Sequence, residues 1–453
     1  MRRALDQALD QILTRPVASL PPPIRNNLRM GAYQILYLSR VPPHAAVNEA
    51  VALARKHGSS GMARLTNAVL RELSRRGAAG IRWPEDPVQR IAVQESYPDW
   101  LISMWIADHG LEDARLLARA QNQPPPFSLR ANQLKISGAD LAARLEEAGL
   151  SALPSPVVPE GVRLASPGNR TLSTGPDLAG DHPVGEAGPG MAETLDREGF
   201  PGEPGDDSGL GFEEAPARGA VSKLPGYAAG WWYVQGEGAM LAARAVSPGP
   251  GQLIADVGSA PGGKATHLAE LMGDRGRVLA IEPNAARLAL IADNARRLGL
   301  ESVEPILGDG RRLLETLLAS GRKGEDALVD AALVDAPCSG LGTLYRKADL
   351  RWRARADEIP HLARLQRELL DAAARAIRPG GALVYATCTI SRLENAEVVR
   401  EFLADHPDFA PGDLASRLPE AWRPEAREGM IQLLPHRHGT EGFFIARMER
   451  AGT

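Results

Sequence analysis

Two cysteines, Cys338 and Cys388, are the only thiols among the 453 residues of this chain, and each directly follows a stretch that reads as a buried strand. A single cysteine is more often a small buried hydrophobe than a reactive group. In parallel sheets, however, ligands bind outside the carboxyl ends of the strands. If the two strands are neighbours, about 4.8 Å apart, both thiols can face one crevice. This placement favours thiol chemistry. A redox pair is the alternative, although the C-x-x-C spacing is absent.

A glycine-rich loop follows another predicted strand and opens a helix over Thr266–Met272. Glycines let the backbone approach a ligand closely, and the start of a helix offers unpaired N–H groups. The loop is neither the phosphate-binding G-x-x-x-x-G-K-[ST] motif nor a clean dinucleotide G-x-G-x-x-G motif. Its residues are Asp256, Val257, Gly258, Ser259, Ala260, Pro261, Gly262, Gly263 and Lys264.

Acidic residues stand at the ends of the next two predicted strands. Glu282 either holds ribose hydroxyls, as an acidic group at this position commonly does, or is a carboxylate at the start of the next helix. Asp309 either contacts an adenine amino group or caps the helix that follows. Lys264 either lowers the pKa of a nearby thiol or is a solvated helix residue. The residues alone leave each of these alternatives open.

Strands and helices alternate from Gly251 onwards, and these elements must position the residues named above. Alternation of this kind predicts an α/β fold with a doubly wound, parallel, Rossmann-like sheet. A helix over 362–377 carries its apolar residues on one face. The predicted strands are Leu253–Val257, Arg277–Glu282, Val303–Leu307, Ala331–Asp335, Ala382–Ala386 and Phe443–Met448.

The rest of the chain divides into segments of different composition. Residues 1–80 have helical spacing, with predicted helices over Arg25–Leu38, Ala45–Lys56 and Leu65–Arg76. Residues 81–167 continue as helices and then form a small α/β module. Residues 168–220 are rich in glycine and proline and predict a disordered acidic insert, with an acidic docking segment as the alternative. Residues 221–453 form the α/β domain.

The net charge of −4 is unevenly distributed. Residues 175–218 hold 11 acidic and 2 basic side chains, so the remaining chain carries +5 and is compatible with a nucleic-acid partner. Two cysteines are too few for a disulfide scaffold, no apolar run approaches the roughly 20 residues of a membrane span, and Asp6 and Asp10 interrupt any secretory signal. We therefore expect a cytoplasmic protein, a monomer, without a membrane or metal partner.

The C-terminal half resembles the RNA cytosine-C5 methyltransferases of the Sun family, and nearly the whole chain resembles the members that act on bacterial small-subunit ribosomal RNA. The two cysteine motifs together are highly specific for this family. Residues Arg25–Arg71 are similar to the RNA-binding domain of the antitermination factor NusB. The segments that match the methyltransferases are Trp231–Gln235, Asp256–Lys264, Asp335–Gly342 with Arg346–Trp352, Tyr385–Cys388 with Glu394-Asn395, and His438–Phe444.

The resemblance implies transfer of a methyl group from S-adenosylmethionine to carbon 5 of a cytidine in small-subunit rRNA. It implies that Cys388 adds to carbon 6 of the base, which activates carbon 5, and that Cys338 helps to release the product. Asp335, if its site keeps it protonated, hydrogen-bonds the ring. Gly258–Lys264, Glu282, Asp309 and Asp335 align with the cofactor contacts of the family.

The target base must leave its stack to reach the thiol, so basic residues beside the site are expected to hold the RNA. Arg346, Lys347 and Arg351 are candidates, with an exposed charged loop as the alternative reading. The resemblance implies two further RNA contacts in the α/β module, Arg130 and Asn132.

The chain departs from the family pattern at several positions. Gly258-Ser259 stand where Cys-Ala is usual, and Glu282, Ala348 and Thr389 replace the common Asp, Pro and Ser. The NusB-like domain starts late, which predicts either a misassigned start or a reduced RNA-binding surface. The same chemistry on tRNA or large-subunit RNA is an alternative function. A catalytically idle RNA-binding or antitermination-type protein is another, against which the retention of both cysteines argues.

Overall fold

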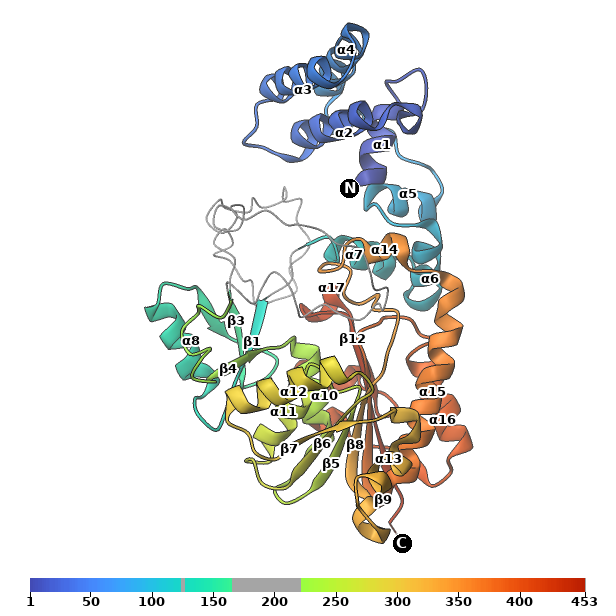
Figure 1. Cartoon of the computed structure of the whole chain (residues 1–453). Coiled ribbons are helices and arrows are strands. Elements are labelled where there is room, and N and C mark those ends of the chain that lie inside the picture. The colour runs from blue at the N-terminus through green and yellow to red at the C-terminus, as the bar shows by residue number, and fades with distance from the viewer. Residues whose placement is uncertain (124–126, 165–220, 453) are drawn as a thin grey trace. The chain divides into compact units, whose positions relative to one another are not determined.

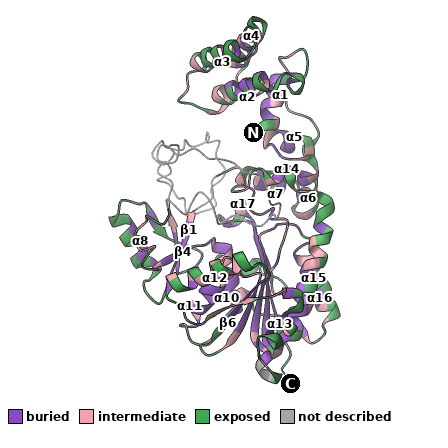
Figure 2. Cartoon of the chain, in the orientation of Figure 1, coloured by how far each residue is buried: buried purple, intermediate pink, exposed green. Residues whose placement is uncertain are grey.

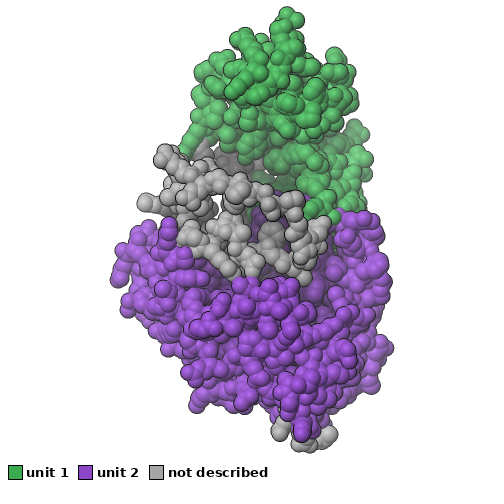
Figure 3. Space-filling model, in the orientation of Figure 1, with its two compact units in different colours: residues 1–123, 177–186, 351–353 green, residues 124–176, 187–350, 354–453 purple. Residues whose placement is uncertain are grey.

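A computed structural model of the chain describes residues 1–123, 127–164 and 221–452 (Figure 1). The predicted insert over 168–220 lies outside these residues. Buried side chains gather along the inner faces of the helices and along the strands (Figure 2). The described residues form two units (Figure 3): one contains residues 1–123 and 351–353, and the other contains residues 127–164, 221–350 and 354–452. No helix in the described part of the chain is long and apolar enough to span a membrane.

The first unit is helical, which confirms the prediction for residues 1–80. Prolines occupy the first turns of three of its helices, where the missing N–H costs nothing. The Ser59 hydroxyl caps another helix by accepting from the Met62 N–H, and Gly77 ends that helix at φ +63°. The helices are α1 (Arg2–Asp10), α2 (Pro22–Tyr37), α3 (Pro43–His57), α4 (Ser60–Arg76), α5 (Pro87–Gln94), α6 (Asp99–His109) and α7 (Leu111–Ala120), and α14 (Leu350–Arg353) contributes residues 351–353.

The second unit contains a small antiparallel sheet of order β2-β3-β1-β4. Its strands are β1 (Phe127–Ala131), β2 (Ala152–Pro154), β3 (Gly161–Leu164) and β4 (Trp232–Val234), with helix α8 (Gly138–Glu147) packed against them. The strand and helix predicted for the small α/β module are present. The structure also places Trp232–Val234 in this sheet, paired with β1, although the sequence assigned these residues to the catalytic domain.

The larger sheet has the order β10-β12-β9-β8-β5-β6-β7, and β11 pairs with β12 outside this path. The ladders from β9 to β7 are parallel, as predicted. The prediction of a wholly parallel sheet is wrong at its other edge, because β12 runs antiparallel to β9, β10 and β11. The connection from β11 to β12 is shorter than a parallel crossover requires. The strands are β5 (Leu253–Val257), β6 (Arg277–Glu282), β7 (Val303–Leu307), β8 (Val329–Asp335), β9 (Ile377–Thr387), β10 (Phe409–Pro411), β11 (Met430–Leu433) and β12 (Phe443–Arg450).

Helices cover both faces of this sheet, so its strands are buried on two sides (Figure 1). One face packs against α10 (Glu237–Val246), α11 (Gly263–Leu271) and α12 (Ala285–Leu298). The other packs against α13 (Leu313–Ala319), α15 (Ile359–Ala376) and α16 (Ala396–Asp405). A short helix, α17 (Pro435–His438), precedes β12. This arrangement leaves the carboxyl edge of the parallel strands for ligands.

Candidate active site

The carboxyl edge of the parallel strands brings the predicted site residues into one row. Cys388 follows β9, Asp335 ends β8, and the glycine loop follows β5. Glu282 ends β6, and Asp309 lies just beyond β7. The sequence predicts that both thiols face one crevice if the strands that precede them are neighbours. The strands β8 and β9 are paired neighbours, so both cysteines follow adjacent strands.

The two thiols are in contact, with 3.4 Å between the Sγ atoms of Cys338 and Cys388. The hydrogen bond from Cys338 lowers the pKa of the Cys388 thiol, and the nearby ammonium groups of Lys347 and Lys264 act in the same direction. The same contact, together with burial, raises the pKa of Cys338 well above that of an ordinary thiol. Cys388 is therefore the sulfur that ionises first, and Cys338 is its thiol donor.

The glycine loop is held tightly beneath the site. Gly258 has φ +77°, and a Cβ at this position would lie 2.4 Å from the backbone oxygen of Asp335. Gly262, at φ +101°, is the residue from which α11 begins. The Ser259 hydroxyl donates to the Asp256 carboxylate at 2.7 Å. Only glycine fits at Gly258, where the loop passes against the backbone of Asp335 before α11 begins.

Burial raises the pKa of the Asp256 carboxyl to about 7. Between about pH 4 and pH 7, the Asp256 carboxyl is protonated in the folded protein and ionised in the unfolded chain. The free energy of unfolding that this proton contributes is therefore lost as the pH rises from about 4 through 7. Asp256→Asn keeps an oxygen for Ser259 but cannot ionise. In urea unfolding at about pH 5 and about pH 8, we expect the variant to gain stability relative to the unaltered protein at the higher pH. An unchanged difference between the two proteins would contradict this assignment.

A cavity of about 270 Å³ opens beside the thiol of Cys388. Lys264 and Asp335 face each other in its wall, with 2.6 Å between Nζ and Oδ2. The reading of Lys264 as a solvated residue is therefore wrong. The lining residues are Gln235, Gly236, Ala239, Ser259, Ala260, Pro261, Gly263, Lys264, Arg287, Leu290, Asp335, Thr343, Tyr345, Arg346, Lys347, Cys388, Glu441 and Phe443.

Glu282 and Asp309 lie farther along the edge, outside the lining of this cavity. Glu282 is buried and accepts from the backbone N–H of Asn284, which is the residue that caps α12. Asp309 accepts from the backbone N–H of Arg311 and forms a two-pronged pair with its guanidinium, which lowers the pKa of Asp309. In this structure Asp309 thus caps the helical turn after β7, which was the alternative reading.

The predicted RNA-binding residues fall into two groups. Arg346 and Lys347 line the cavity. Arg351 is buried in the helical unit, where its guanidinium lies over the Tyr97 ring and donates to Asn122 Oδ1 at 2.9 Å. The predictions for Arg130 and Asn132 are corrected as well, because both side chains are fully buried within the second unit. All three side chains are buried and are therefore not accessible to RNA in this structure.

Arg130 instead joins the small sheet to the catalytic domain. Its guanidinium makes two hydrogen bonds to Glu270 of α11, at 3.0 and 2.8 Å. It also donates to the side chain of Gln235, the hydroxyl of Thr266 and the backbone oxygen of Gly263. Asn132 donates to the backbone oxygen of Leu298. These contacts hold the beginning of α11, and with it the glycine loop, against β1.

Arg130→Ala is expected to lower the free energy of unfolding by about 3–5 kcal/mol, because Glu270 would remain as a buried charge without its partner. Urea unfolding followed by circular dichroism measures this loss. Arg296→Ala is the matched control, since Arg296 pairs with Asp293 on the exposed surface of α12, and we expect no measurable change there. Equal effects of the two substitutions would show that the buried pair is not a structural anchor.

Sequence reasoning gave no role to several residues of the cavity wall. Gln235, Glu441 and Phe443 lie within segments that carried the family resemblance. Tyr345 precedes the predicted RNA contact Arg346, and burial raises the pKa of its hydroxyl well above the usual range. A hydrogen bond fixes the position of the Glu441 side chain, whose carboxylate accepts from the backbone N–H of Gly238 at the start of α10. Their proximity to Cys388 depends on pairing between distant strands.

Comparison with known proteins agrees with this geometry. The family model "16S rRNA methyltransferase RsmB/F" matches residues 243–449, the NusB family model matches residues 1–75, and the RsmF/B-like ferredoxin-like domain matches residues 97–171. A Synechocystis protein described as a probable ribosomal RNA small subunit methyltransferase B is 35% identical over 99% of this chain and 88% of its own length. The chain belongs to this RsmB/F family.

Other members and a solved structure extend the likeness. A Bacillus subtilis protein with the same description is 34% identical over 99% of this chain and 87% of its own length. The crystal structure of a methyltransferase homolog from Pyrococcus horikoshii is 25% identical, with a TM-score of 0.57, and covers 81% of this chain and all of that one. The RsmB/F assignment confirms an rRNA methyltransferase with a NusB-like domain, a ferredoxin-like domain and a Rossmann-like catalytic domain.

Proposed function

We propose that this RsmB/F-family enzyme transfers a methyl group from S-adenosylmethionine to carbon 5 of one cytidine in 16S rRNA, through a covalent bond between Cys388 and carbon 6. The observation that carries the proposal is the contact of two thiols at 3.4 Å, of which Cys388 ionises first, beside the Lys264–Asp335 pair. The family membership supports 16S rRNA as the substrate.

The residues present fit the methyl donor. Several residues of the glycine loop line the cavity, and the N–H groups at the start of α11 suit an anionic group. Glu282, at the end of β6, would face the ribose hydroxyls of the same ligand. When bound, S-adenosylmethionine supplies an electrophilic methyl group.

The chemistry of the chain's own residues follows from the thiol pair. The Cys388 thiolate adds to carbon 6 of the cytosine, and the electron pair of the ring double bond becomes available at carbon 5, where the new carbon–carbon bond forms. Before the attack, the thiol of Cys338 donates a hydrogen bond to the Cys388 thiolate and stabilises it. After transfer, the proton on carbon 5 passes to solvent, the electron pair of that C–H bond re-forms the double bond between carbons 5 and 6, and the Cys388 sulfur leaves carbon 6 as a thiolate. We assign Cys338 to this release step, since its sulfur is the one in contact with that of Cys388.

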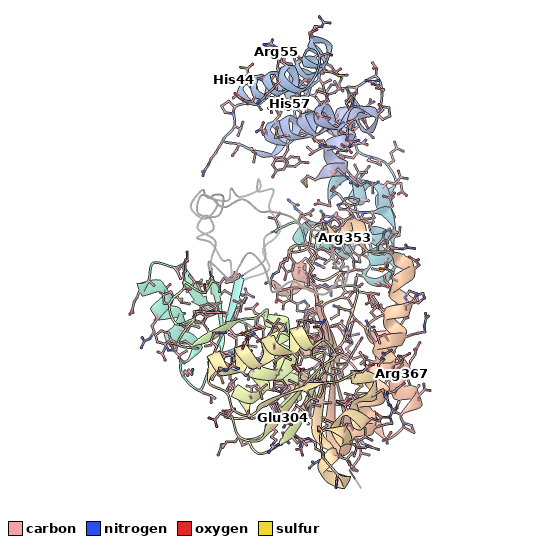
Figure 4. All side chains as sticks on the ribbon, in the orientation of Figure 1. His44, Arg55, His57, Glu304, Arg353 and Arg367 are labelled. Atoms are coloured by element: carbon pink, nitrogen blue, oxygen red, sulfur yellow. The ribbon has the colours of Figure 1, made fainter. Side chains whose placement is uncertain are left out.

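Two groups of basic residues are the proposed RNA contacts. Arg346 and Lys347 line the catalytic cavity and can bind the phosphates next to an extruded base. In the helical unit, α3 carries the exposed side chains of His44, Arg55 and His57 (Figure 4). Because the proposed substrate is ribosomal RNA, we propose that the enzyme acts in the cytoplasm, and we propose that it acts as a monomer.

The test is to incubate the purified protein with methyl-labelled S-adenosylmethionine and, separately, 16S rRNA, 23S rRNA and tRNA. We expect label in 16S rRNA alone, and bisulfite sequencing should place it at one cytidine. Label in tRNA or 23S rRNA but not in 16S rRNA would overturn the proposed substrate. Methylation of 16S rRNA that bisulfite does not detect would overturn the assignment to carbon 5.

A further inference from the structure

One buried carboxylate, that of Glu394, joins the two cysteine loops from behind. Its side chain is completely buried. One oxygen accepts from the backbone N–H of Ser339 at 2.8 Å, and the other accepts from the Ser339 hydroxyl at 2.5 Å and from the Thr389 hydroxyl at 3.2 Å. Ser339 directly follows Cys338, and Thr389 directly follows Cys388. A single side chain therefore ties together the two residues next to the two thiols.

The surroundings of Glu394 fix its position. The Tyr385 hydroxyl donates to its backbone oxygen at 2.6 Å. The Gln366 amide group donates both to the Glu394 carboxylate, at 3.2 Å, and to the backbone oxygen of Pro337, at 2.9 Å. The cysteine between Pro337 and Ser339 is thus held on both sides by the Glu394–Gln366 pair. Such a network has little freedom to move without displacing the thiol.

The charges around the thiol pair are unequal. Lys264 and Lys347 lower the pKa of Cys388, whereas the Glu394 carboxylate is among the groups that raise the pKa of Cys338. Asp335, which also faces Cys388, opposes its two lysines. Glu394 thus adds to the electrostatic difference between the two sulfurs from the side of Cys338.

We propose that Glu394 is a positioning residue that holds Cys338 against Cys388 as its thiol partner, and so decides which of the two sulfurs attacks the cytosine. The inference rests on the proposed function. Glu394 does not touch the substrate; it acts through Ser339, Thr389 and the two cysteine loops.

Glu394→Gln tests the proposal with little change in shape. The carboxylate accepts from four donor groups, whereas an amide has one oxygen and presents N–H donors in place of the other. The amide oxygen can keep the two N–H contacts, but the amide nitrogen can only donate, so the Ser339 and Thr389 hydroxyls must turn round and accept. The substitution also removes the negative charge beside Cys338. Glu397→Gln is the matched control, because Glu397 lies nearby in α16 and pairs with Arg392 at the surface.

In assays with 16S rRNA, we expect Glu394→Gln to lower kcat by about 10–100-fold with KM for RNA nearly unchanged, as small misplacements of a reacting group do. We also expect the variant to accumulate an enzyme–RNA adduct under denaturing electrophoresis, because release by Cys338 is impaired. Ser339→Ala, which removes only one hydroxyl, should change both readouts in the same direction by less. It also tests the proposal if Glu394→Gln does not fold.

A second measurement needs no RNA. Alkylation by iodoacetamide, followed by peptide mass spectrometry, gives the ratio of the rates at Cys388 and Cys338. We expect Glu394→Gln to lower this ratio by about tenfold, the equivalent of one pKa unit, and Glu397→Gln to leave it unchanged. If the unaltered protein methylates no RNA but Glu394→Gln still changes the alkylation ratio, the proposed function is rejected and this inference is retained. The inference would be overturned if Glu394→Gln had the same kcat and the same alkylation ratio as the Glu397→Gln control. It would also be overturned if Glu394→Gln lost activity but showed neither an adduct nor an altered alkylation ratio.

Discussion

Cys388→Ala is expected to lower methyl transfer to 16S rRNA by at least about 10³-fold, because the variant lacks the nucleophile on which the activation of carbon 5 depends. The structure gives this residue the lower thiol pKa of the pair and a place in the cavity wall. Incorporation of labelled methyl groups under single-turnover conditions measures the loss. Binding of RNA and of S-adenosylmethionine should be nearly unchanged, since alanine adds no bulk to the cavity.

The control for this substitution is thermal unfolding, which should show that the variant remains folded. Methylation by Cys388→Ala at a rate close to that of the unaltered protein would show that Cys388 is not the nucleophile. If Cys338→Ala alone lost the ability to form any adduct, the roles of the two sulfurs would be exchanged.

Cys338→Ala is expected to behave differently, since it retains the nucleophile and loses the group that assists release. The covalent enzyme–RNA complex should accumulate and appear as a slowly migrating band on denaturing gels with labelled 16S rRNA. Turnover should fall by about 10²-fold or more, the usual contribution of a positioned proton-transfer group. The thiol contact at 3.4 Å is the reason to expect an effect on the bond that Cys388 forms.

The double variant Cys338→Ala/Cys388→Ala separates this adduct from other crosslinks. It should form no slowly migrating band, because the attacking sulfur is absent. A band of equal intensity in the double variant would show that the adduct does not involve Cys388. Absence of the band in the single Cys338→Ala variant, together with normal turnover, would remove Cys338 from the mechanism.

The parallel part of the catalytic sheet could be predicted from the sequence because its strands are covered on both faces. Leu253–Val257 and Arg277–Glu282 have the predicted bounds, since short apolar runs between turn residues and helices mark buried strands. The edge strand Val303–Leu307 also has the predicted bounds, although it is only half-buried. The neighbouring positions of β8 and β9 placed both cysteines at one edge. The direction of β12 could not be predicted, because an apolar run is the same in either direction.

Long-range partners account for most of what the sequence did not show. Arg130 finds Glu270 at a separation of 140 residues, and nothing local distinguishes a buried arginine of this kind from one that binds RNA. Arg351 is similar, since its partner Asn122 lies 229 residues away. The Lys264–Asp335 pair also depends on the pairing of β5 with β8, which brings the start of α11 next to the end of β8. Each of these side chains was singled out for its charge, and the fold decides whether that charge faces solvent or another residue.

The small sheet cannot be completed until strand β4, which comes late in the chain, has been synthesised. Leu129 of β1 pairs with Val234, 105 positions later in the chain. During synthesis on the ribosome, β1 and β3 can pair early, but the other edge of β1 keeps unsatisfied N–H and C=O groups until the chain has been extended past Val234. An exposed strand edge of this kind is a template for association with other chains. Prematurely terminated products that end between residues 165 and 231 should therefore aggregate, whereas those that extend beyond Val234 should not do so through this edge.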